Sequence, residues 1–370
     1  MSVDFGEPTL TGLVILLFAA LLRFGSKLSD AVVYRLQVVR GRAVLHMPIV
    51  DHLPKGADVE ELETIVGDLV RAQNWTRLSE VLTLLSHQPA DATDGRRLYE
   101  VAMARAVASI RWAGGLAVVR DRLARYEEAA AVGDPQLEAI RARALTEAVR
   151  LAGAQPASIA ARALRRSWAE DIGQLLGASR QRVSRVPALA EAAFHAGCAL
   201  PGAEGRVPGR FQVWRDADAC DPRSCIAYAR WLRQHGTASA ISAHLTVTHA
   251  AIRWFGTPAP FIETALALAG ERPLNRVPGL DVGALLVRLA DIADSQPGQV
   301  LANRVAAKAL ADGDELLART VLSRHIRIIV TTEWPDADTV LALYWRATQG
   351  ARPALPSRDL RDDPFVRGAV

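Results

Sequence analysis

The segment IGQLLGASRQRVSRVP, residues 172–187, carries the clearest candidate chemistry in the sequence. An apolar helix would lead to a turn at Gly177 and then to a second helix. The second helix would carry three outward-facing arginines, Arg180, Arg182 and Arg185. Arginines bind phosphates and guanine edges, so the pattern predicts a DNA-reading helix-turn-helix. It also fits a bend between two packed helices, because Pro187 limits the second helix to about two turns. We expect the bend, with a DNA-binding regulator using residues 172–186 as the alternative.

A second group of residues could bind a metal ion. One histidine and three cysteines occur within a short stretch, namely His195, Cys198, Cys220 and Cys225. Such a set can hold zinc in tetrahedral geometry, and two of the cysteines could instead form a disulfide. Free cysteines are more often buried as small apolar side chains. We therefore expect core cysteines, and no metal or cofactor.

Sequence motifs of the common enzyme classes do not occur in this chain. There is no nucleophile elbow, no phosphate-binding loop, no dinucleotide fingerprint and no zinc-protease motif. Acidic residues near expected helix starts are ordinary capping residues. No catalytic residue is predicted, and a non-catalytic function is favoured.

Three aromatic residues are the candidate protein-binding residues: Tyr228, Trp231 and Trp254. Exposed aromatic side chains often anchor a bound peptide or helix. The same residues recur at helical spacing, which is also typical of side chains packed in a core. Both interpretations remain open at this point.

The elements that would position these residues are predicted to be helical hairpins in series. Apolar residues recur at helical spacing after Asp58, which would cap the first helix, and again after Trp75, and Asn74 would take the left-handed turn between them. Near the C-terminus, Gly313 and Asp314 would end one helix and begin the next. Helices are expected at about 98–112, 116–131, 135–153, 157–170, 187–200, 207–219, 223–235, 238–254, 260–270 and 283–295. Residues 327–332, RIIVTT, fit a helix end or a short extended piece.

Residues 211–236 resemble the junction between two tetratricopeptide repeats. Trp214, Ala217 and Pro222 match the end of one repeat, and Tyr228 and Trp231 match the start of the next. The usual glycine is missing after Trp231, and no fixed repeat period continues along the chain. The resemblance implies an all-α fold, a tetratricopeptide-like α-solenoid of antiparallel hairpins with a concave binding surface. An irregular helical bundle is the alternative.

The N-terminal region could contact a membrane. Residues 8–22 carry no charge, and the apolar stretch from Leu10 to Leu22 would be short for a full span. It can be a membrane anchor, a core helix or a cleaved signal. Positive residues follow it, which places the rest of the chain on the cytoplasmic side if it crosses an inner membrane. Residues 1–45 would include a second, basic amphipathic helix that lies on an anionic surface or caps the body.

Composition limits the remaining choices. Half of the residues are apolar, and the net charge of +4 excludes a polycation. Lys and Arg total 44, and all but three are arginine, which is typical of a GC-rich genome. After a linker at 46–56, we expect a helical-repeat body at 57–349 and a loose tail at 350–370. The expected function is a scaffold or adaptor that binds another protein, at the cytoplasmic face of a membrane.

Overall fold

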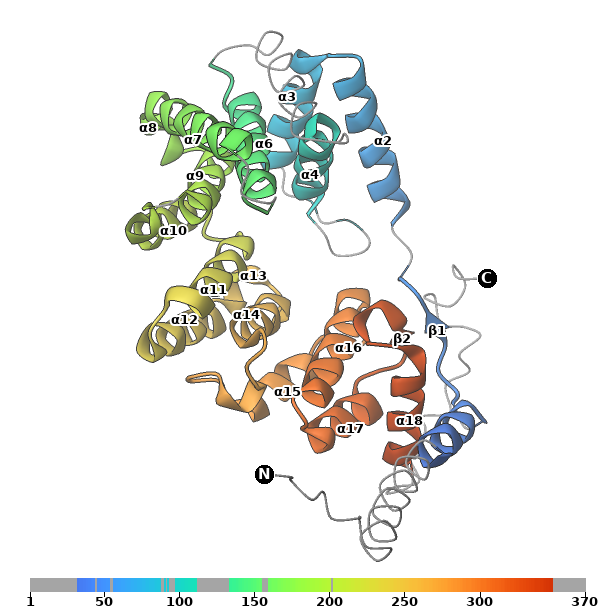
Figure 1. The fold of residues 1–370 in the computed structure, drawn as a ribbon. Helices are drawn as coiled ribbons and strands as arrows, with labels where there is room; N and C mark the ends of the chain where they lie inside the picture. Colours follow the sequence, from blue (N-terminus) through green and yellow to red (C-terminus); the bar gives the residue numbers. More distant parts are fainter. Residues whose placement is uncertain are drawn as a thin grey trace, which may run out of the picture. The chain divides into compact units, whose positions relative to one another are not determined.

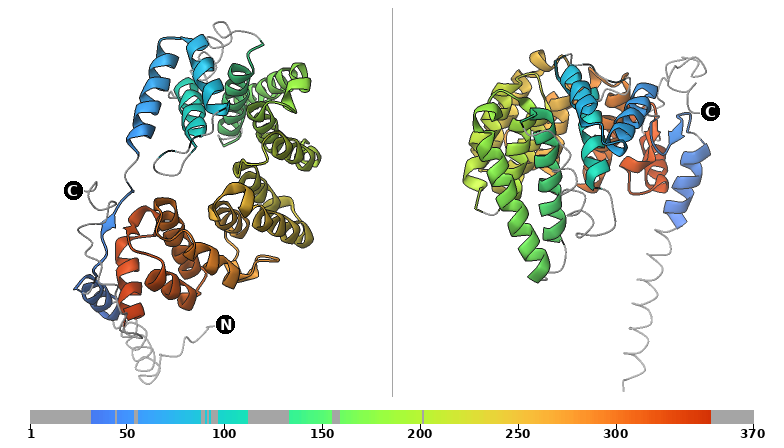
Figure 2. Two further views of the ribbon diagram at one scale, coloured as in Figure 1. Left: turned by 180° about the vertical axis from the view of Figure 1, so that it is seen from behind. Right: turned by 90° about the horizontal axis from the view of Figure 1, so that it is seen from above.

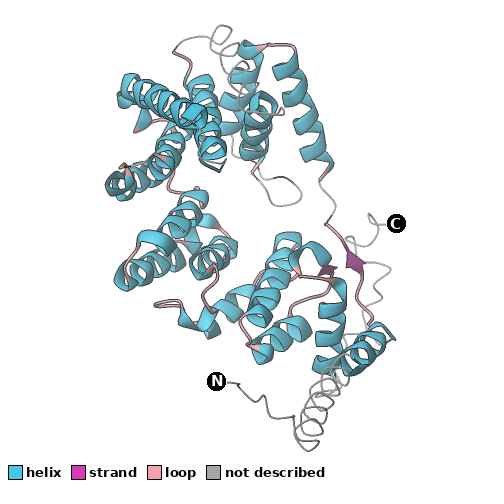
Figure 3. Ribbon diagram, in the orientation of Figure 1, coloured by secondary structure: helices cyan, strands magenta, loops and turns pink. Residues whose placement is uncertain are grey.

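The computed structural model describes residues 32–43, 45–53, 56–87, 90, 92, 97–111, 133–154, 159–200 and 202–348. Their regular secondary structure is helical apart from one pair of two-residue strands, which confirms the predicted all-α class (Figures 1 and 3). The stretch from Leu10 to Leu22, the helix expected at 116–131 and the tail at 350–370 lie outside these ranges. Within the described ranges, no helix combines the length and the apolar character needed to cross a membrane.

The chain forms two compact units. The central unit contains residues 53–301, and the terminal unit contains residues 1–52 together with 302–370. The first boundary falls within the segment 46–56, for which the sequence predicts a linker. The second boundary falls inside a helix.

The described part of the central unit consists mainly of helices (Figures 1 and 2). Its elements are α2 (Ala57–Arg71), α3 (Trp75–His87), α4 (Leu98–Arg111), α6 (Pro135–Ala154), α7 (Ile159–Ala178), α8 (Arg180–Val183), α9 (Pro187–Ala199), η1 (Glu204–Arg206), α10 (Val207–Ala217), α11 (Arg223–His235), α12 (Ala238–Ala250), α13 (Ile252–Phe255), α14 (Ala259–Ala269), η2 (Leu274–Arg276), α15 (Val282–Ala290) and the start of α16 (Gln296–Ala311).

Helices in this unit pack on the next helix and on the one beyond it. Each of α2, α6, α9 and α11 packs on the helix that follows it, and α2 also packs on α4, α4 on α6 and α6 on α9. The main core lies between these helices and includes the fully buried Leu78, Met103, Ile140, Ile172 and Leu189. The row α2–α4–α6–α9 is therefore formed by helices that are not consecutive in the chain.

Local sequence explains why this row forms. Asp134 begins α6, because its Oδ1 accepts the backbone N–H groups of Gln136 (2.9 Å) and Leu137 (3.1 Å). The first residue of α9 is Pro187, whose fixed φ suits a helix start. Helix α9 is rich in alanine and is buried over most of its length, so α6 and α10 can approach it closely.

The terminal unit contains a helix at 32–43, β1 (Ile49–Val50), the end of α16, α17 (Glu315–Arg324), β2 (Ile329–Val330), η3 (Thr331–Glu333) and α18 (Ala337–Thr348). Strands β1 and β2 are parallel and pair Ile49 with Ile329 and Val50 with Val330. The segment RIIVTT thus contains a short extended piece, the second of the two predicted forms. Its β-branched residues are suited to a strand.

The buried side chain of Asn303, on α16, fixes the strand region. Its Nδ2 donates to the carbonyl of Ile328 (2.8 Å), and its Oδ1 accepts from Val330 N–H (3.2 Å) and Trp334 Nε1–H (2.8 Å). We call this arrangement the amide clamp. One neutral side chain thus provides hydrogen-bond partners for three polar groups in β2 and in the residues on either side of it.

Two predicted hairpin turns have the same hydrogen-bond pattern but differ in how well they were predicted. Gly313 has φ +80°, and Asp314 Oδ1 accepts from the N–H of Leu317 at 3.0 Å, as expected. At the other turn the left-handed residue is Gln73 (φ +56°) and not Asn74, which instead begins α3 by accepting from the N–H of Arg77. The predicted cap at Asp58 is also wrong, because α2 begins at Ala57 after Gly56.

Candidate functional site

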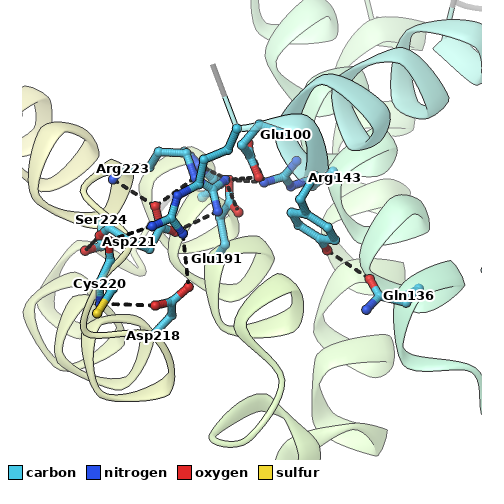
Figure 4. A network of polar contacts seen from close by, with 12 residues as sticks. Glu100, Gln136, Arg143, Glu191, Asp218, Cys220, Asp221, Arg223 and Ser224 are labelled. Carbon is cyan, nitrogen blue, oxygen red and sulfur yellow. Dashed lines mark hydrogen bonds and ion pairs between the residues drawn. The ribbon is translucent and has the colours of Figure 1, made fainter. Parts of the chain in front are cut away.

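Four charged side chains meet inside the central unit, each from a different helix (Figure 4). They are Glu100 on α4, Arg143 on α6, Glu191 on α9 and Arg223 on α11, so the sign of the charge alternates from helix to helix. All four are at most about one-quarter exposed. This is the most concentrated group of buried charges in the described part of the chain.

The four side chains form a closed ring, which we call the charge ring. Arg143 Nη2 contacts Glu191 Oε1 and lies 3.7 Å from Glu100 Oε2. Arg223 Nη1 lies 2.8 Å from Glu191 Oε2 and contacts Glu100 Oε1. Each arginine therefore faces carboxylates from two other helices.

Asp221 holds Arg223 in its orientation. The carboxylate of Asp221 is fully buried and accepts two bonds from the guanidinium, from Nε at 2.8 Å and from Nη2 at 2.6 Å. It also accepts the backbone N–H of Arg223 at 3.0 Å, next to the first turn of α11. This bidentate geometry fixes the plane of the guanidinium as well as its position.

The surroundings of the charge ring join the start of α4 to the loop between α10 and α11. Arg97 Nη2 donates to the carbonyl of Cys220 at 2.9 Å, and Arg97 Nη1 lies 3.5 Å from Asp218 Oδ2. Tyr99 donates its hydroxyl to Gln136 Oε1 at 2.9 Å (Figure 4). Polar contacts thus connect helices whose sequence positions differ by more than 100 residues.

The two carboxyl groups of the ring have opposite pKa shifts. Burial and, after it, the Glu191 carboxylate raise the pKa of Glu100 to about 7, against the opposing effect of Arg143 and Arg223. Burial would also raise the pKa of Glu191, but the two arginines outweigh it and hold that pKa well below its usual range. Glu191 is therefore the permanent anion of the ring, and Glu100 changes charge near neutral pH.

The geometry of the charge ring suits a structural role. Both guanidinium groups already face carboxylates of the protein, so neither is presented to a phosphate. Deleting one member would leave the others buried without compensation, which destabilises a protein strongly. The ring can hold α4, α6, α9 and α11 in one arrangement, and its net charge depends on the protonation of Glu100.

The sequence interpretation missed the charge ring. One signal was available, because Glu191 lies within the otherwise apolar helix PALAEAAFHAGCA and Arg143 lies on an Ala- and Leu-rich helix. A charged residue at such a position needs a buried partner. The sequence does not indicate which of the many arginines and acids supplies it.

The predicted helix-turn-helix segment differs from the expectation in its local structure. Gly177 lies inside α7 and not in the turn, and the second helix, α8, is a single turn of four residues. Ser179 begins α8, yet its hydroxyl donates to Glu138 Oε2 (2.7 Å) and does not cap the helix. A helix this short has little length to place in a DNA groove.

The three arginines of that segment do not form one outward-facing group. Arg182 donates to the carbonyl of Gly133 (2.7 Å) and pairs with Glu138 (3.0 Å) on α6. Arg185 is exposed, and the side chain of Arg180 lies outside the described part. The expectation that Arg182 points away from the protein is wrong, because an acid on α6 attracts it. DNA binding by this segment stays a prediction.

The three candidate protein-binding aromatics have different environments. Tyr228 stacks on Phe211 (ring centroids 4.1 Å apart) and on Trp231 (5.6 Å), and both candidates are half-buried. Trp254 on α13 is 63% exposed, and the Arg253 guanidinium lies 5.1 Å from the centre of its ring. Tyr228 and Trp231 therefore contribute to packing, and Trp254 is presented to solvent.

The cysteines are not brought together as a metal site. Cys225 is buried as expected, but Cys198 and Cys220 are exposed, so the expectation of core positions is wrong for these two. They lie in the last turn of α9 and in the loop after α10, where fewer helices surround them. Among residues with described positions, no cluster of three or more His, Cys, Asp or Glu side chains could hold a metal ion.

No protein-family profile matches the chain, and neither a curated protein nor a solved structure gives a match.

Proposed function

We propose that this chain is a non-catalytic scaffold or adaptor that binds another protein through the surface of its helices, at the cytoplasmic face of a membrane. We further propose that its helices stack as tetratricopeptide-like pairs. The support for stacking is the row α2–α4–α6–α9, in which each helix packs on the next member of the row. In addition, α2, α6 and α9 each pack on the helix that follows them in the chain. Stacked pairs of this kind produce extended binding surfaces.

Trp254 is the observation that carries the proposal. A tryptophan is among the residues most often buried on average, and this one is 63% exposed. Tryptophan and arginine are the residue types that contribute most to protein–protein affinity, and here they are adjacent and stacked.

Two further exposed apolar residues lie on α12, the helix before α13, and on α15, which approaches α12. Val247 on α12 is 44% exposed and Val287 on α15 is 60% exposed. Arg288, next to Val287, places its Nε 3.4 Å from His249 Nε2 on α12, so the two helices approach each other here. This surface, defined by Val247, Arg253, Trp254 and Val287, is the proposed protein-binding surface.

The test is photo-crosslinking in the producing organism, with a photoreactive phenylalanine at position 254 of the full chain. We expect one reproducible crosslinked partner. With the partner then purified, Trp254→Ala should weaken its binding by about tenfold or more, as for a central interface tryptophan.

Ile159 on α7 provides the matched control, because it is also a large apolar residue and is 81% exposed. Ile159→Ala should leave the affinity unchanged, and a crosslinker at 159 should not capture the same partner. Equal capture from both positions, or turnover of a substrate by the purified chain, would contradict the proposal.

A further inference from the structure

The helix at 32–43 packs on α18 of the same unit through one side. Val38 is buried against Leu341 and Ala342 of α18. Gly41 brings the helix backbone against the carbonyl of Leu341, so closely that an added Cβ would overlap it. These contacts define the inner face of the helix.

The opposite face carries an apolar stripe. Val32, Leu36 and Val39 are spaced by four and three residues, so they lie one above another on a helix. Their exposed fractions are 53%, 48% and 64%. Three large aliphatic side chains thus share a face with no covering element among the described residues.

Arginines flank this stripe on both sides. At about 100° per residue, Arg35 and Arg42 lie on one edge of the stripe and Arg40 on the other. All three are exposed. Arg40 also lies over the ring of Trp345, 5.5 Å from its centre, which holds it beside the stripe.

We infer that this face of the helix binds an anionic phospholipid surface. The inference rests on the proposed location at a membrane and adds the chemistry that would produce it. An interfacial helix places its apolar stripe at the boundary between headgroups and acyl chains, and its flanking arginines contact phosphates. Such a surface meets the stripe and both arginine edges at once.

The sequence before the helix supports a lipid surface over a protein partner. Nine residues, 23–31, separate the uncharged residues 8–22 from Val32. A helix bound to lipid would therefore follow a segment of the chain that is itself apolar enough to contact lipid. The segment 23–31 between them contains Arg23 and Lys27, which are suited to the headgroup region.

The experiment measures sedimentation of the full chain with vesicles of phosphatidylcholine alone or mixed with phosphatidylglycerol, at low and high salt. Two double variants are compared, Arg35→Gln with Arg42→Gln and Leu36→Gln with Val39→Gln. We expect the wild type to prefer the anionic vesicles. The arginine variant should bind them roughly thirty-fold more weakly at low salt, since each surface arginine contributes about five-fold.

The apolar variant should weaken binding to both kinds of vesicle, because the apolar contact does not depend on lipid charge. The control is Leu316→Gln with Arg324→Gln on α17, which changes one exposed apolar and one exposed basic residue elsewhere in the same unit. Circular dichroism checks that each variant is folded.

Wild-type binding by both double variants would overturn the inference, because the membrane contact would then come from another part of the chain. Binding to neither vesicle type by the wild type would also overturn it. The crosslink at position 254 is read separately, so failure of lipid binding is distinguishable from failure of the protein-binding proposal.

Discussion

The two units of this protein hold their structural elements together with different kinds of buried polar contact. The central unit uses the charge ring, in which two arginines and two glutamates come from four helices. The terminal unit uses the amide clamp, in which one neutral asparagine makes three hydrogen bonds. The charge ring joins α4 to α11, whereas the amide clamp joins residues 25–31 positions apart.

The difference between them is their sensitivity to conditions. A neutral amide has the same donors and acceptors at every physiological pH. The charge ring contains Glu100, whose pKa of about 7 makes its charge variable. The stability of the central unit should therefore depend on the protonation of Glu100, while the amide clamp itself contains no group that titrates near neutral pH.

Breaking the charge ring should have the largest effect on stability. Glu191→Gln removes the permanent anion and leaves Arg143 and Arg223 with excess positive charge in a buried site. We expect a loss of about 3–5 kcal/mol in the free energy of unfolding of the central unit. Urea unfolding, followed by hydrogen exchange of peptides from α6 and α9, measures it.

Glu80→Gln is the control for that variant. Glu80 pairs with Arg77 on the surface of α3, with both side chains more than half exposed. Such a pair contributes about 0–1 kcal/mol. If Glu191→Gln lowers the free energy of unfolding no more than Glu80→Gln does, the charge ring does not hold the helices together.

Removing the amide clamp should have the next largest effect, and only in the terminal unit. Asn303→Leu has a similar volume but leaves Ile328 C=O, Val330 N–H and Trp334 Nε1 without this partner. We expect a loss of about 3 kcal/mol, since an unsatisfied buried group costs about 1–3 kcal/mol and some will find water. Faster hydrogen exchange at 326–334 is the readout.

Arg304→Gln, one position further along α16, removes the more exposed ion pair with Glu333 and should change exchange little. Equal increases in hydrogen exchange for Asn303→Leu and Arg304→Gln would show that the amide clamp does not stabilise the strand region.

Titration of Glu100 should give a smaller, pH-dependent effect. Its pKa is raised from 4.5 to about 7 in the folded protein, so the folded state keeps a proton that the unfolded state releases. Stability should therefore fall as the pH rises from about 4.5 to 7. Wild type should lose on the order of 1–3 kcal/mol relative to Glu100→Gln over this range, since one pKa unit corresponds to about 1.4 kcal/mol.

The comparison with the variant is essential, because His244 in the same unit has a pKa lowered by burial and changes stability in the opposite direction. Urea unfolding of both proteins at pH 5 and pH 7.5 provides the measurement. Parallel pH dependences in the two proteins would rule out Glu100 as the titrating group.

The two hairpin turns should give the smallest effects, with opposite signs. Gln73 at φ +56° adopts a conformation that is strained for a residue with a Cβ, whereas Gly313 at φ +80° does so freely. Gln73→Gly should stabilise the central unit by about 0.5–1 kcal/mol, and Gly313→Ala should destabilise the terminal unit by about 1 kcal/mol. Thermal unfolding of each variant tests the signs; two changes of the same sign would contradict the comparison.

These turns also show how far the sequence predicts the structure. Gly313 and Asp314 have strong local preferences, so their turn was predicted at the correct residues. The limits of α11 were likewise predicted at 223–235, between Pro222 and Gly236. At Gln73 the local preference favours Asn74, and the requirement to bring α2 against α3 overrides it.

The charge ring could not be predicted because its pairing depends on helix packing. Glu191 and Arg223 are 32 residues apart, and Arg223 must also reach Glu100 on α4. With 44 basic residues in the chain, the sequence offers many equivalent partners for each acid. Arg182 illustrates the same limit, since Glu138 on α6 draws it inward.

The pairing of β1 with β2 has a consequence for the synthesis of the chain. Asp51 and Thr331, which are hydrogen-bonded beside these strands, are 280 positions apart. A ribosome adds about 5–20 residues per second, so β1 waits roughly 15–60 s for its partner while the central unit emerges. During that interval its backbone groups form an open edge, which another chain could pair with. Nascent chains that stop before Ile329 should therefore be the most dependent on chaperones.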